Sequence, residues 1–349
     1  MPLIEETENI FFGDKKPVYI IAEMSANHAQ NFDKALEIIY AAKKSGADCI
    51  KIQTYTPDTM TIDSDEEYFQ IRKGTWKGEN LYGLYQKAYT PWKWQHRLKE
   101  ETEKIGLDFL STPFDKTAVD FLEKLDIDFY KIASFELTDV PLIRYIASKG
   151  KPIIMSTGMA TLGEIEEAVK IVKEQGNNKL CLLKCCSAYP AVPEDMNLKT
   201  MENMAQTFGV TVGLSDHSLG STVAVTAVAL GAKVIEKHFC LSRDIKTPDS
   251  SFSMEPDEFK EMVEKVRLAE KALGKVHYNI SEKEEVSRLH RRSIFVVEDI
   301  KKGEEFTEKN IRIIRPGQGL KPKFYDEVIG KMSSCDIKRG TPLSWNKVI

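Results

Sequence analysis

Two histidines end neighbouring apolar stretches, and their type and spacing suit a metal ion. His217 closes "GLSDH" and His238 closes "VIEKH". If these stretches are adjacent strands, their ends lie about 4.8 Å apart, so both imidazoles can reach one ion. Two imidazoles are fewer than the three protein ligands of a typical catalytic zinc. The pair therefore favours a divalent ion that polarises a carbonyl oxygen, with hydrogen-bonded structural histidines as the alternative.

Lysines within apolar stretches indicate an anion. Lys51, Lys131 and Lys184 all lie inside such stretches, and a fully buried lysine is rare unless it meets a negative charge. Around one cavity with hydroxyl groups, these lysines would suit a small phosphorylated, carboxylated anion. The alternative is that each lysine points outward and pairs with a carboxylate. Glu23, at the end of the first apolar stretch, is a candidate base or water-orienting group, or else a supporting residue.

The elements that position these residues alternate along the chain. Amphipathic stretches such as "FDKALEIIYAAKK" separate short β-prone runs, which lie at 18–26, 49–55, 108–114, 129–135, 152–158, 181–187, 210–217 and 234–240. Eight such units predict an α/β fold, a (β/α)₈ TIM barrel, in which reacting groups gather at the carboxyl ends of the strands. A doubly wound open sheet is the second choice, because no GxGxxG turn follows the first run.

Three further segments complete the predicted organisation. Residues 56–90 are too long for an ordinary βα loop, so they are either a lid or substrate-selecting loop, or an inert excursion. We assign residues 1–274 to the barrel, 275–292 to a polar linker and 293–349 to a small β-rich domain. A core of that size is marginal alone, so we expect the small domain to dock on a barrel, its own or a partner's.

Composition excludes several classes of function. The net charge is −4 and no basic stripe occurs, which disfavours a nucleic-acid partner. No apolar run approaches the roughly 18–20 residues of a membrane span. The acidic N-terminus lacks the pattern of a signal peptide. We interpret the six cysteines as buried, reduced thiols. We therefore expect a cytoplasmic protein without a membrane partner.

Several motifs, in order along the chain, resemble the sialic acid synthase family. The blocks are "IAEMSANH", "KIQTYTPDT", "STPFD", "YKIASFE", "MSTGMAT", "CSAYP", "GLSDHSLG" and "EKHF". The tail "IRPGQGLKP" resembles that family's C-terminal SAF domain, also called antifreeze-like. Within the family, "GTWKGENLYGLYQKAYTPWKW", "SFELTDVPLI" and "LKCCSAYP" are most similar to the pseudaminic branch. Phe135 and Ser187 depart from the N-acetylneuraminate branch.

The resemblance implies an activity. The family joins phosphoenolpyruvate to the open-chain aldehyde of an N-acetylated sugar and releases phosphate by C–O cleavage. In the pseudaminic branch the sugar is 2,4-diacetamido-2,4,6-trideoxy-altrose. N-acetylneuraminate and legionaminic acid synthases are the alternatives within the family. A metal-dependent barrel aldolase or phosphatase and a non-catalytic sugar-binding protein are more distant ones.

The resemblance also implies roles for individual residues. His217 and His238 would hold Mn²⁺, with Mg²⁺ or Co²⁺ as alternatives, and Glu23 would lie near the reacting centre. The phosphoenolpyruvate cradle would comprise Lys51, Thr112, Lys131, Ser134, Ser156, Ser187 and Ser215. The sugar would contact Gln53, Glu136, Tyr189 and Asp249. Arg315 would reach the sugar from the other subunit, which implies a homodimer with a domain-swapped SAF domain.

Overall fold

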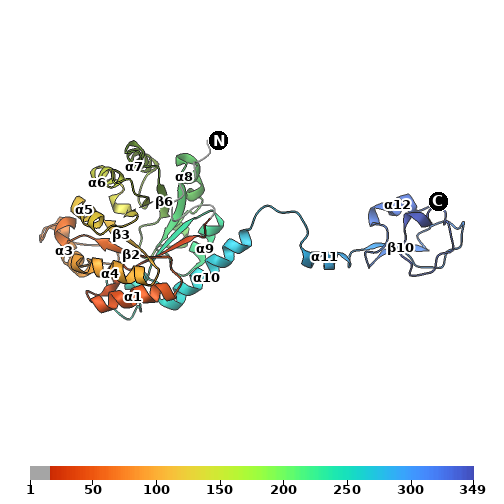
Figure 1. The fold of residues 1–349 in the computed structure, drawn as a ribbon, viewed down its shortest axis with the longest axis horizontal. Coiled ribbons are helices and arrows are strands. Elements are labelled where there is room, and N and C mark those ends of the chain that lie inside the picture. Colours follow the sequence, from red (N-terminus) through yellow and green to blue (C-terminus); the bar gives the residue numbers. More distant parts are fainter. Residues whose placement is uncertain (1–15) are drawn as a thin grey trace. The chain divides into compact units, whose positions relative to one another are not determined.

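The structure is a computed structural model that describes residues 16–349, and its larger part is a closed barrel of eight parallel strands (Figure 1). Strand β1 pairs with β2 on one side and with β8 on the other, which closes the barrel. The predicted (β/α)₈ barrel is therefore confirmed. The strands are β1 (Tyr19–Glu23), β2 (Cys49–Thr54), β3 (Asp108–Pro113), β4 (Tyr130–Ile132), β5 (Ile153–Ser156), β6 (Leu180–Cys185), β7 (Thr211–Asp216) and β8 (Val234–His238).

Amphipathic helices surround the barrel. Helix α7 is typical: it begins at a capping box of Thr161 and Glu164 and buries Ile165, Val169 and Val172. Such an apolar stripe packs against the outward-facing residues of the strands and forms the main core. The surrounding helices are α1 (Phe32–Lys44), α4 (Trp92–Lys104), α5 (Lys116–Lys124), α6 (Val140–Ala147), α7 (Leu162–Glu174), α8 (Thr200–Phe208), α9 (Thr222–Ala229) and α10 (Pro256–Leu273).

A second, smaller core fills the inside of the barrel and aims the polar residues. Its members include Cys49 of β2 and Val234 of β8. Side chains of a strand alternate between its two faces, so every second residue shares a side. Lys51 and Gln53 therefore follow Cys49 into the barrel, and His238 follows Val234 at the same spacing. The apolar residues close the bottom of the barrel, while the polar residues reach its open mouth.

The segment that follows β2 is not a plain loop, because it contains two helices. These are α2 (Pro57–Met60) and α3 (Leu81–Ala88). The Trp76 indole N–H donates to the carbonyl oxygen of Pro248 at 2.8 Å, and the Thr75 hydroxyl donates to the carbonyl oxygen of Tyr189. At the end of the segment, Tyr89 accepts a hydrogen bond from the Gln30 amide at 2.5 Å. These bonds tie the segment to loops at the barrel mouth.

Residues 275–349 form a separate compact unit with its own apolar core. Strands β9 (Ser293–Val296) and β10 (Ile311–Ile314) pair antiparallel, and a short helix, α12 (Tyr325–Val328), follows. The predicted linker at 275–292 contains a helix, α11 (Glu282–Arg288), which begins at a capping box of Ser281 and Glu284. Sequence reasoning missed this helix because most of its residues are polar and exposed.

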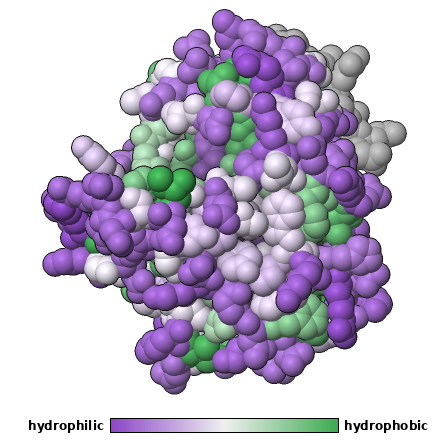
Figure 2. Space-filling view, turned by 90° about the vertical axis from the view of Figure 1, so that its left-hand side faces the viewer, coloured by the Kyte–Doolittle hydropathy of each residue, from purple (hydrophilic) through white to green (hydrophobic). Residues whose placement is uncertain are grey.

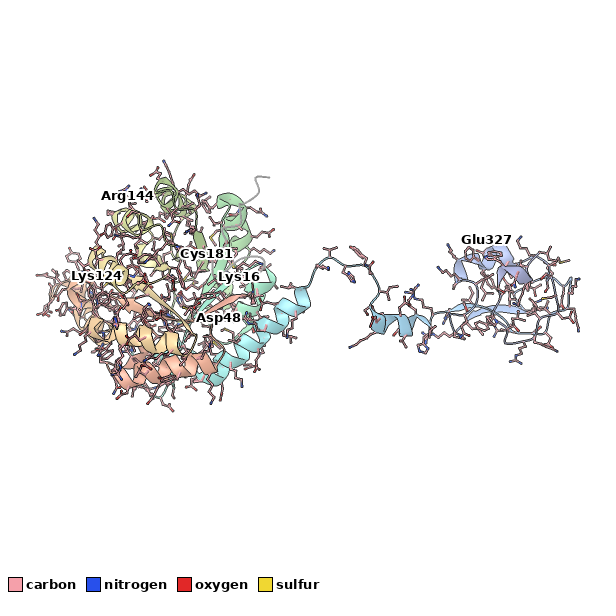
Figure 3. All side chains as sticks on the ribbon, in the orientation of Figure 1. Lys16, Asp48, Lys124, Arg144, Cys181 and Glu327 are labelled. Atoms are coloured by element: carbon pink, nitrogen blue, oxygen red, sulfur yellow. The ribbon has the colours of Figure 1, made fainter. Side chains whose placement is uncertain are left out.

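The cysteines are free thiols, and two of them are not buried as predicted. Cys49, Cys181, Cys185 and Cys240 are buried, whereas Cys186 is half-buried and Cys335 is exposed. Cys181 lies inside the barrel (Figure 3). None of the helices within residues 16–349 combines the length and the apolar composition that a membrane span needs. The acidic N-terminal segment used to predict a cytoplasmic location lies outside the described residues.

Candidate functional site

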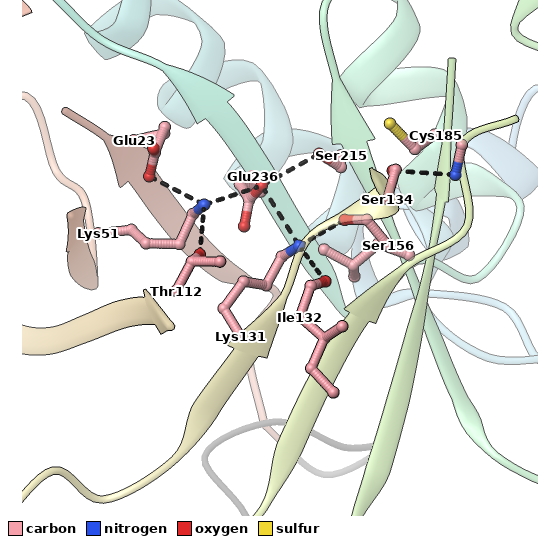
Figure 4. A network of polar contacts seen from close by, with 12 residues as sticks. Glu23, Lys51, Thr112, Lys131, Ile132, Ser134, Ser156, Cys185, Ser215 and Glu236 are labelled. Carbon is pink, nitrogen blue, oxygen red and sulfur yellow. Dashed lines mark hydrogen bonds and ion pairs between the residues drawn. The ribbon is translucent and has the colours of Figure 1, made fainter. Parts of the chain in front are cut away.

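The polar residues at the mouth of the barrel form a continuous network around Lys51 (Figure 4). The Lys51 ammonium lies 3.0 Å from Glu23 Oε2 and 3.5 Å from Glu236 Oε1. It also donates to the Thr112 hydroxyl at 3.4 Å. The Gln53 amide, in turn, donates to Glu23 Oε1 at 2.9 Å. Residues of four consecutive strands of the closed barrel, β8, β1, β2 and β3, thus meet at one ammonium group.

Lys131 extends the network to the next strands. Its ammonium donates to the Ser156 hydroxyl at 2.6 Å and lies 3.9 Å from Glu236 Oε1. That same carboxylate oxygen accepts a hydrogen bond from the Ser215 hydroxyl at 3.0 Å. Glu236 therefore joins the two lysines (Figure 4). Sequence reasoning gave Glu236 no role, although its position two residues before His238 on β8 placed it inside the barrel.

Burial and charge oppose each other in this network. Burial raises the pKa of Glu23, with Glu236 adding to the rise and Lys51 opposing it. Burial alone would raise the pKa of Glu236, but Lys131 and Lys51 outweigh it and lower that pKa. Burial alone would lower the pKa of Lys51, but the two carboxylates outweigh it and raise that pKa. For Lys131, burial is the larger effect, and its pKa is lowered. Glu236 is thus the more acidic of the two carboxyl groups, and Glu23 is the more basic one.

Hydroxyl groups line a recess beside Lys131, at Gly158. The Gly158 N–H donates to Ser134 Oγ at 3.0 Å. A Cβ atom added at residue 158 would lie 2.2 Å from Ser187 Oγ, 2.8 Å from Ser134 Oγ and 3.2 Å from Cys185 Sγ. The glycine therefore leaves room for two serines, and hydroxyl and N–H groups next to a lysine suit a phosphate group. All seven residues predicted for phosphoenolpyruvate belong to the Lys51 network or to this recess.

Cys185, which the sequence did not single out, lies between this recess and His217. Burial alone would raise its pKa, but hydrogen bonding and charge from His217, followed by a hydrogen bond from Ser134, lower it to about 7. The thiol is 3.8 Å from His217 Nδ1. The sequence could have indicated that Cys185 faces inward, because it follows two apolar, inward-facing residues of β6, Cys181 and Leu183, at the spacing of side chains that share one face of a strand.

The two predicted metal ligands lie side by side, with ring centroids 5.4 Å apart. His217 Nδ1 is 2.8 Å from the carbonyl oxygen of Cys186, to which it donates, leaving Nε2 free. His238 Nδ1 is buried and has no hydrogen-bond partner within the described residues. Burial holds the pKa of His238 well below its usual value, so the ring is neutral and able to bind a cation. These features fit a divalent ion.

The number of protein ligands is small. Within residues 16–349, no group of three or more histidine, cysteine, aspartate or glutamate side chains is arranged to hold a metal. An ion bound by two imidazoles would take its other ligands from water or substrate. The metal site therefore stays a prediction, in which coordination positions would be open for a carbonyl oxygen.

A cavity of about 400 Å³ adjoins His238. The four residues predicted to contact the sugar, Gln53, Glu136, Tyr189 and Asp249, all line it. Burial raises the pKa of Glu136 to about 7, and its Oε2 has no hydrogen-bond partner among the described residues. Burial likewise raises the pKa of Asp249, which accepts a hydrogen bond from the Ala26 N–H at 3.2 Å.

The remaining lining of this cavity is mainly apolar, and seven of its residues come from the segment at 56–90. Sequence reasoning named none of the seven individually. They are Met60, Ile71, Trp76, Leu81, Leu84, Tyr85 and Ala88. The other lining residues are Ser25, Tyr55, Phe114, Ala133, Phe135, His238 and Pro248.

Two residues singled out from the sequence lie outside the Lys51 network, the recess and the cavity. Lys184 is on the outward face of β6, and its ammonium donates to the carbonyl oxygen of Cys185 at 2.9 Å, so for this lysine the outward-pointing alternative applies. Arg315 is exposed and belongs to the unit formed by residues 275–349.

Comparisons with known proteins cover both units. The NeuB family profile matches residues 38–278, and the SAF domain profile matches residues 291–349. The chain is 50% identical to the pseudaminic acid synthase of Campylobacter jejuni over 332 residues, 95% of this chain and 97% of the relative. It is 47% identical to that of Helicobacter pylori over 330 residues, 94% and 97% of the two chains. The crystal structure of the N-acetylneuraminic acid synthetase from Leptospira borgpetersenii, in complex with citrate, matches with a TM-score of 0.72 and 31% identity, over 80% of this chain and 93% of that one.

The first prediction concerns the recess at Gly158. In Gly158→Ala, the new methyl group displaces the Ser187 and Ser134 hydroxyls, which are ends of side chains and can move without unfolding the barrel. We expect the KM for phosphoenolpyruvate to rise about tenfold with an unchanged melting temperature, measured by phosphate release and thermal unfolding. Gly163→Ala is the control, because its Cβ would meet nothing within 4 Å. An unaltered KM in Gly158→Ala would show that the recess does not bind substrate.

Proposed function

Since the chain belongs to the NeuB family, as its resemblance to sialic acid synthases indicated, we propose that it is a pseudaminic acid synthase. It would condense phosphoenolpyruvate with the open-chain aldehyde of 2,4-diacetamido-2,4,6-trideoxy-altrose and release phosphate. The observation that carries the proposal is the similarity to pseudaminic acid synthases along nearly the whole chain. The free thiols further support a cytoplasmic enzyme, because thiols stay reduced there.

Two adjoining binding regions support this chemistry. Lys51, Lys131 and the hydroxyl groups offer positive charge and hydrogen-bond donors to the phosphate and carboxylate of phosphoenolpyruvate. The cavity lined by Gln53 and Glu136 offers polar groups and apolar surface to the sugar. The regions share a border at Gln53 and Glu23, which are hydrogen-bonded. A substrate in each region would therefore have its reacting carbon close to the other.

The residues at this border have defined tasks in the proposed reaction. C3 of the enol attacks the aldehyde carbon, water adds at C2, and the C–O bond to phosphate then breaks. His217 and His238 would hold a divalent ion, Mn²⁺ with Mg²⁺ or Co²⁺ as alternatives, which when bound supplies Lewis-acid polarisation of the aldehyde. Glu23, whose pKa is raised by burial, can take the proton of the attacking water. Glu236 keeps Lys51 and Lys131 in place before the substrate binds.

Product identification tests the function. We expect phosphate release from phosphoenolpyruvate only with the 2,4-diacetamido-2,4,6-trideoxy-altrose, and a nonulosonic acid of the corresponding mass by mass spectrometry. N-acetylmannosamine and the 2,4-diacetamido sugar of the legionaminic branch are the comparison substrates. A higher kcat/KM with either of these would assign the enzyme to another branch. Binding of a sugar without phosphate release, with and without Mn²⁺, would favour a non-catalytic protein.

Removing one histidine of the pair should cause loss of metal. His238→Ala removes one of the two proposed ligands, so we expect the purified protein to lose stoichiometric metal and at least about a thousandfold in kcat while its circular dichroism stays unchanged. His96→Ala is the matched control, because His96 is an exposed residue of α4. Metal content by mass spectrometry and phosphate release measure the two effects. Full activity of metal-free His238→Ala would contradict the assignment.

We propose further that the protein is a homodimer in which Arg315 completes the sugar site of the partner's barrel. Exposure of Arg315 and the compactness of residues 275–349 as a unit are compatible with this arrangement. Arg315→Ala is expected to raise the KM for the sugar far more than that for phosphoenolpyruvate, whereas Arg312→Ala, an exposed change in the same unit, is not.

Mixing the His238→Ala and Arg315→Ala proteins tests the exchange between subunits, at a sugar concentration far below the KM of Arg315→Ala. After subunit exchange between His238→Ala and Arg315→Ala proteins, half of the dimers are mixed, and each mixed dimer has one complete site if Arg315 acts across the interface. About a quarter of wild-type activity should return. If Arg315 serves its own barrel, every site lacks one residue, and no activity returns.

A further inference from the structure

The cavity beside His238 has two chemically different sides. Its polar side comes from the barrel strands and their loops, with Gln53, Glu136 and Asp249. Its apolar side comes mainly from residues 56–90, here called the apolar wall, which consists of Met60, Ile71, Trp76, Leu81, Leu84, Tyr85 and Ala88. These wall residues are buried or half-buried, whereas Ile62 and Tyr68 of the same segment are exposed. The segment therefore turns one apolar side towards the cavity.

Aromatic contacts connect the apolar wall to His238. The ring of Tyr189 lies 6.2 Å from that of His238 and 5.5 Å from that of Trp76. On another side of the cavity, the Tyr85 ring is 5.7 Å from Tyr55. A sugar with its aldehyde near His238 would thus extend its other end towards the wall.

The apolar wall offers little to a hydroxyl group. Five of its seven residues have no hydrogen-bonding side-chain group of ordinary strength, and the indole N–H of Trp76 is already donated to the carbonyl oxygen of Pro248. A hydroxyl group placed against these five residues would lose its water without gaining a partner, whereas a methyl group would gain contacts. Figure 2, which views the side of the molecule on which α3 lies, shows a mainly hydrophilic surface with scattered hydrophobic residues.

We propose that residues 56–90 select the sugar by its distal end, with the apolar wall binding the C6 methyl group of a 6-deoxy sugar and excluding a 6-hydroxyl group. This inference rests on the proposed function and adds the element that carries its specificity. The barrel strands would bind what all sugars of this class share, namely the aldehyde and its neighbouring acetamido group. The segment after β2 would then distinguish 6-deoxy sugars from fully hydroxylated ones.

The test compares two sugars that differ at one atom. These are 2,4-diacetamido-2,4,6-trideoxy-altrose and its 6-hydroxylated counterpart, each assayed by phosphate release at saturating phosphoenolpyruvate. For the wild type we expect kcat/KM to favour the 6-deoxy sugar by about 10–100-fold, the range in which an apolar pocket rejects an added hydroxyl group. Because both sugars are assayed with the same protein, partial unfolding of a variant cancels in the ratio.

Near-isosteric polar substitutions in the wall are the variants. Leu81→Gln and, independently, Met60→Gln introduce an amide into the cavity, so the preference for the 6-deoxy sugar should fall at least about fivefold in each. The KM for phosphoenolpyruvate should stay within about twofold of wild type, since neither residue touches the phosphate cradle. Ile62→Gln makes the same kind of change in an exposed residue of the segment and should keep the wild-type preference.

The outcomes separate the two proposals. If the wild type is active with both sugars at similar kcat/KM, or if both wall variants keep the wild-type ratio, the apolar wall does not select the sugar, and the proposed function still stands. If the wild type releases no phosphate with either diacetamido sugar, the proposed function fails, and the inference fails with it.

Discussion

Two buried ammonium groups and two buried carboxyl groups share the mouth of the barrel, and the rest of the site depends on their balance. Lys51 contacts both carboxylates, and Glu236 lies between Lys51 and Lys131. An isolated buried charge is costly, and removing one partner of a buried pair is strongly destabilising. Because the charges compensate one another, the lysines are held in position without a bound anion. A phosphorylated substrate would meet donors that are already oriented, which is the condition for electrostatic catalysis.

Closure of the barrel is what brings these groups together. Glu236 comes from the last strand, yet it reaches Lys51 of the second strand because β8 pairs with β1. The same alternation that puts Cys49 and Val234 into the lower core puts Lys51 and His238 at the mouth. The inward face of each strand thus carries apolar core residues at the bottom of the barrel and reactive residues at its mouth.

In the proposed function, the barrel and the segment after β2 would have different tasks. The strands carry the charged cradle and the histidine pair, which would serve the reacting atoms that all substrates of this class share. Residues 56–90 are attached through Thr75 and Trp76 and contribute the apolar side of the sugar cavity. A rigid scaffold that holds reactive groups, with a long loop that adjusts substrate choice, is a common arrangement in barrel enzymes.

The sequence by itself determined the eight-stranded barrel, the pairing of His217 with His238 and the gathering of Lys51, Lys131 and the serines at one end. These depend on local periods, because alternation within a strand and the order of strands put given residues on a given face. Only the tertiary structure decided that Glu236 links the lysines, that Lys184 faces outward and that the segment after β2 lines the sugar cavity. Such contacts join residues far apart in the chain, so they follow from barrel closure and packing rather than from any local pattern.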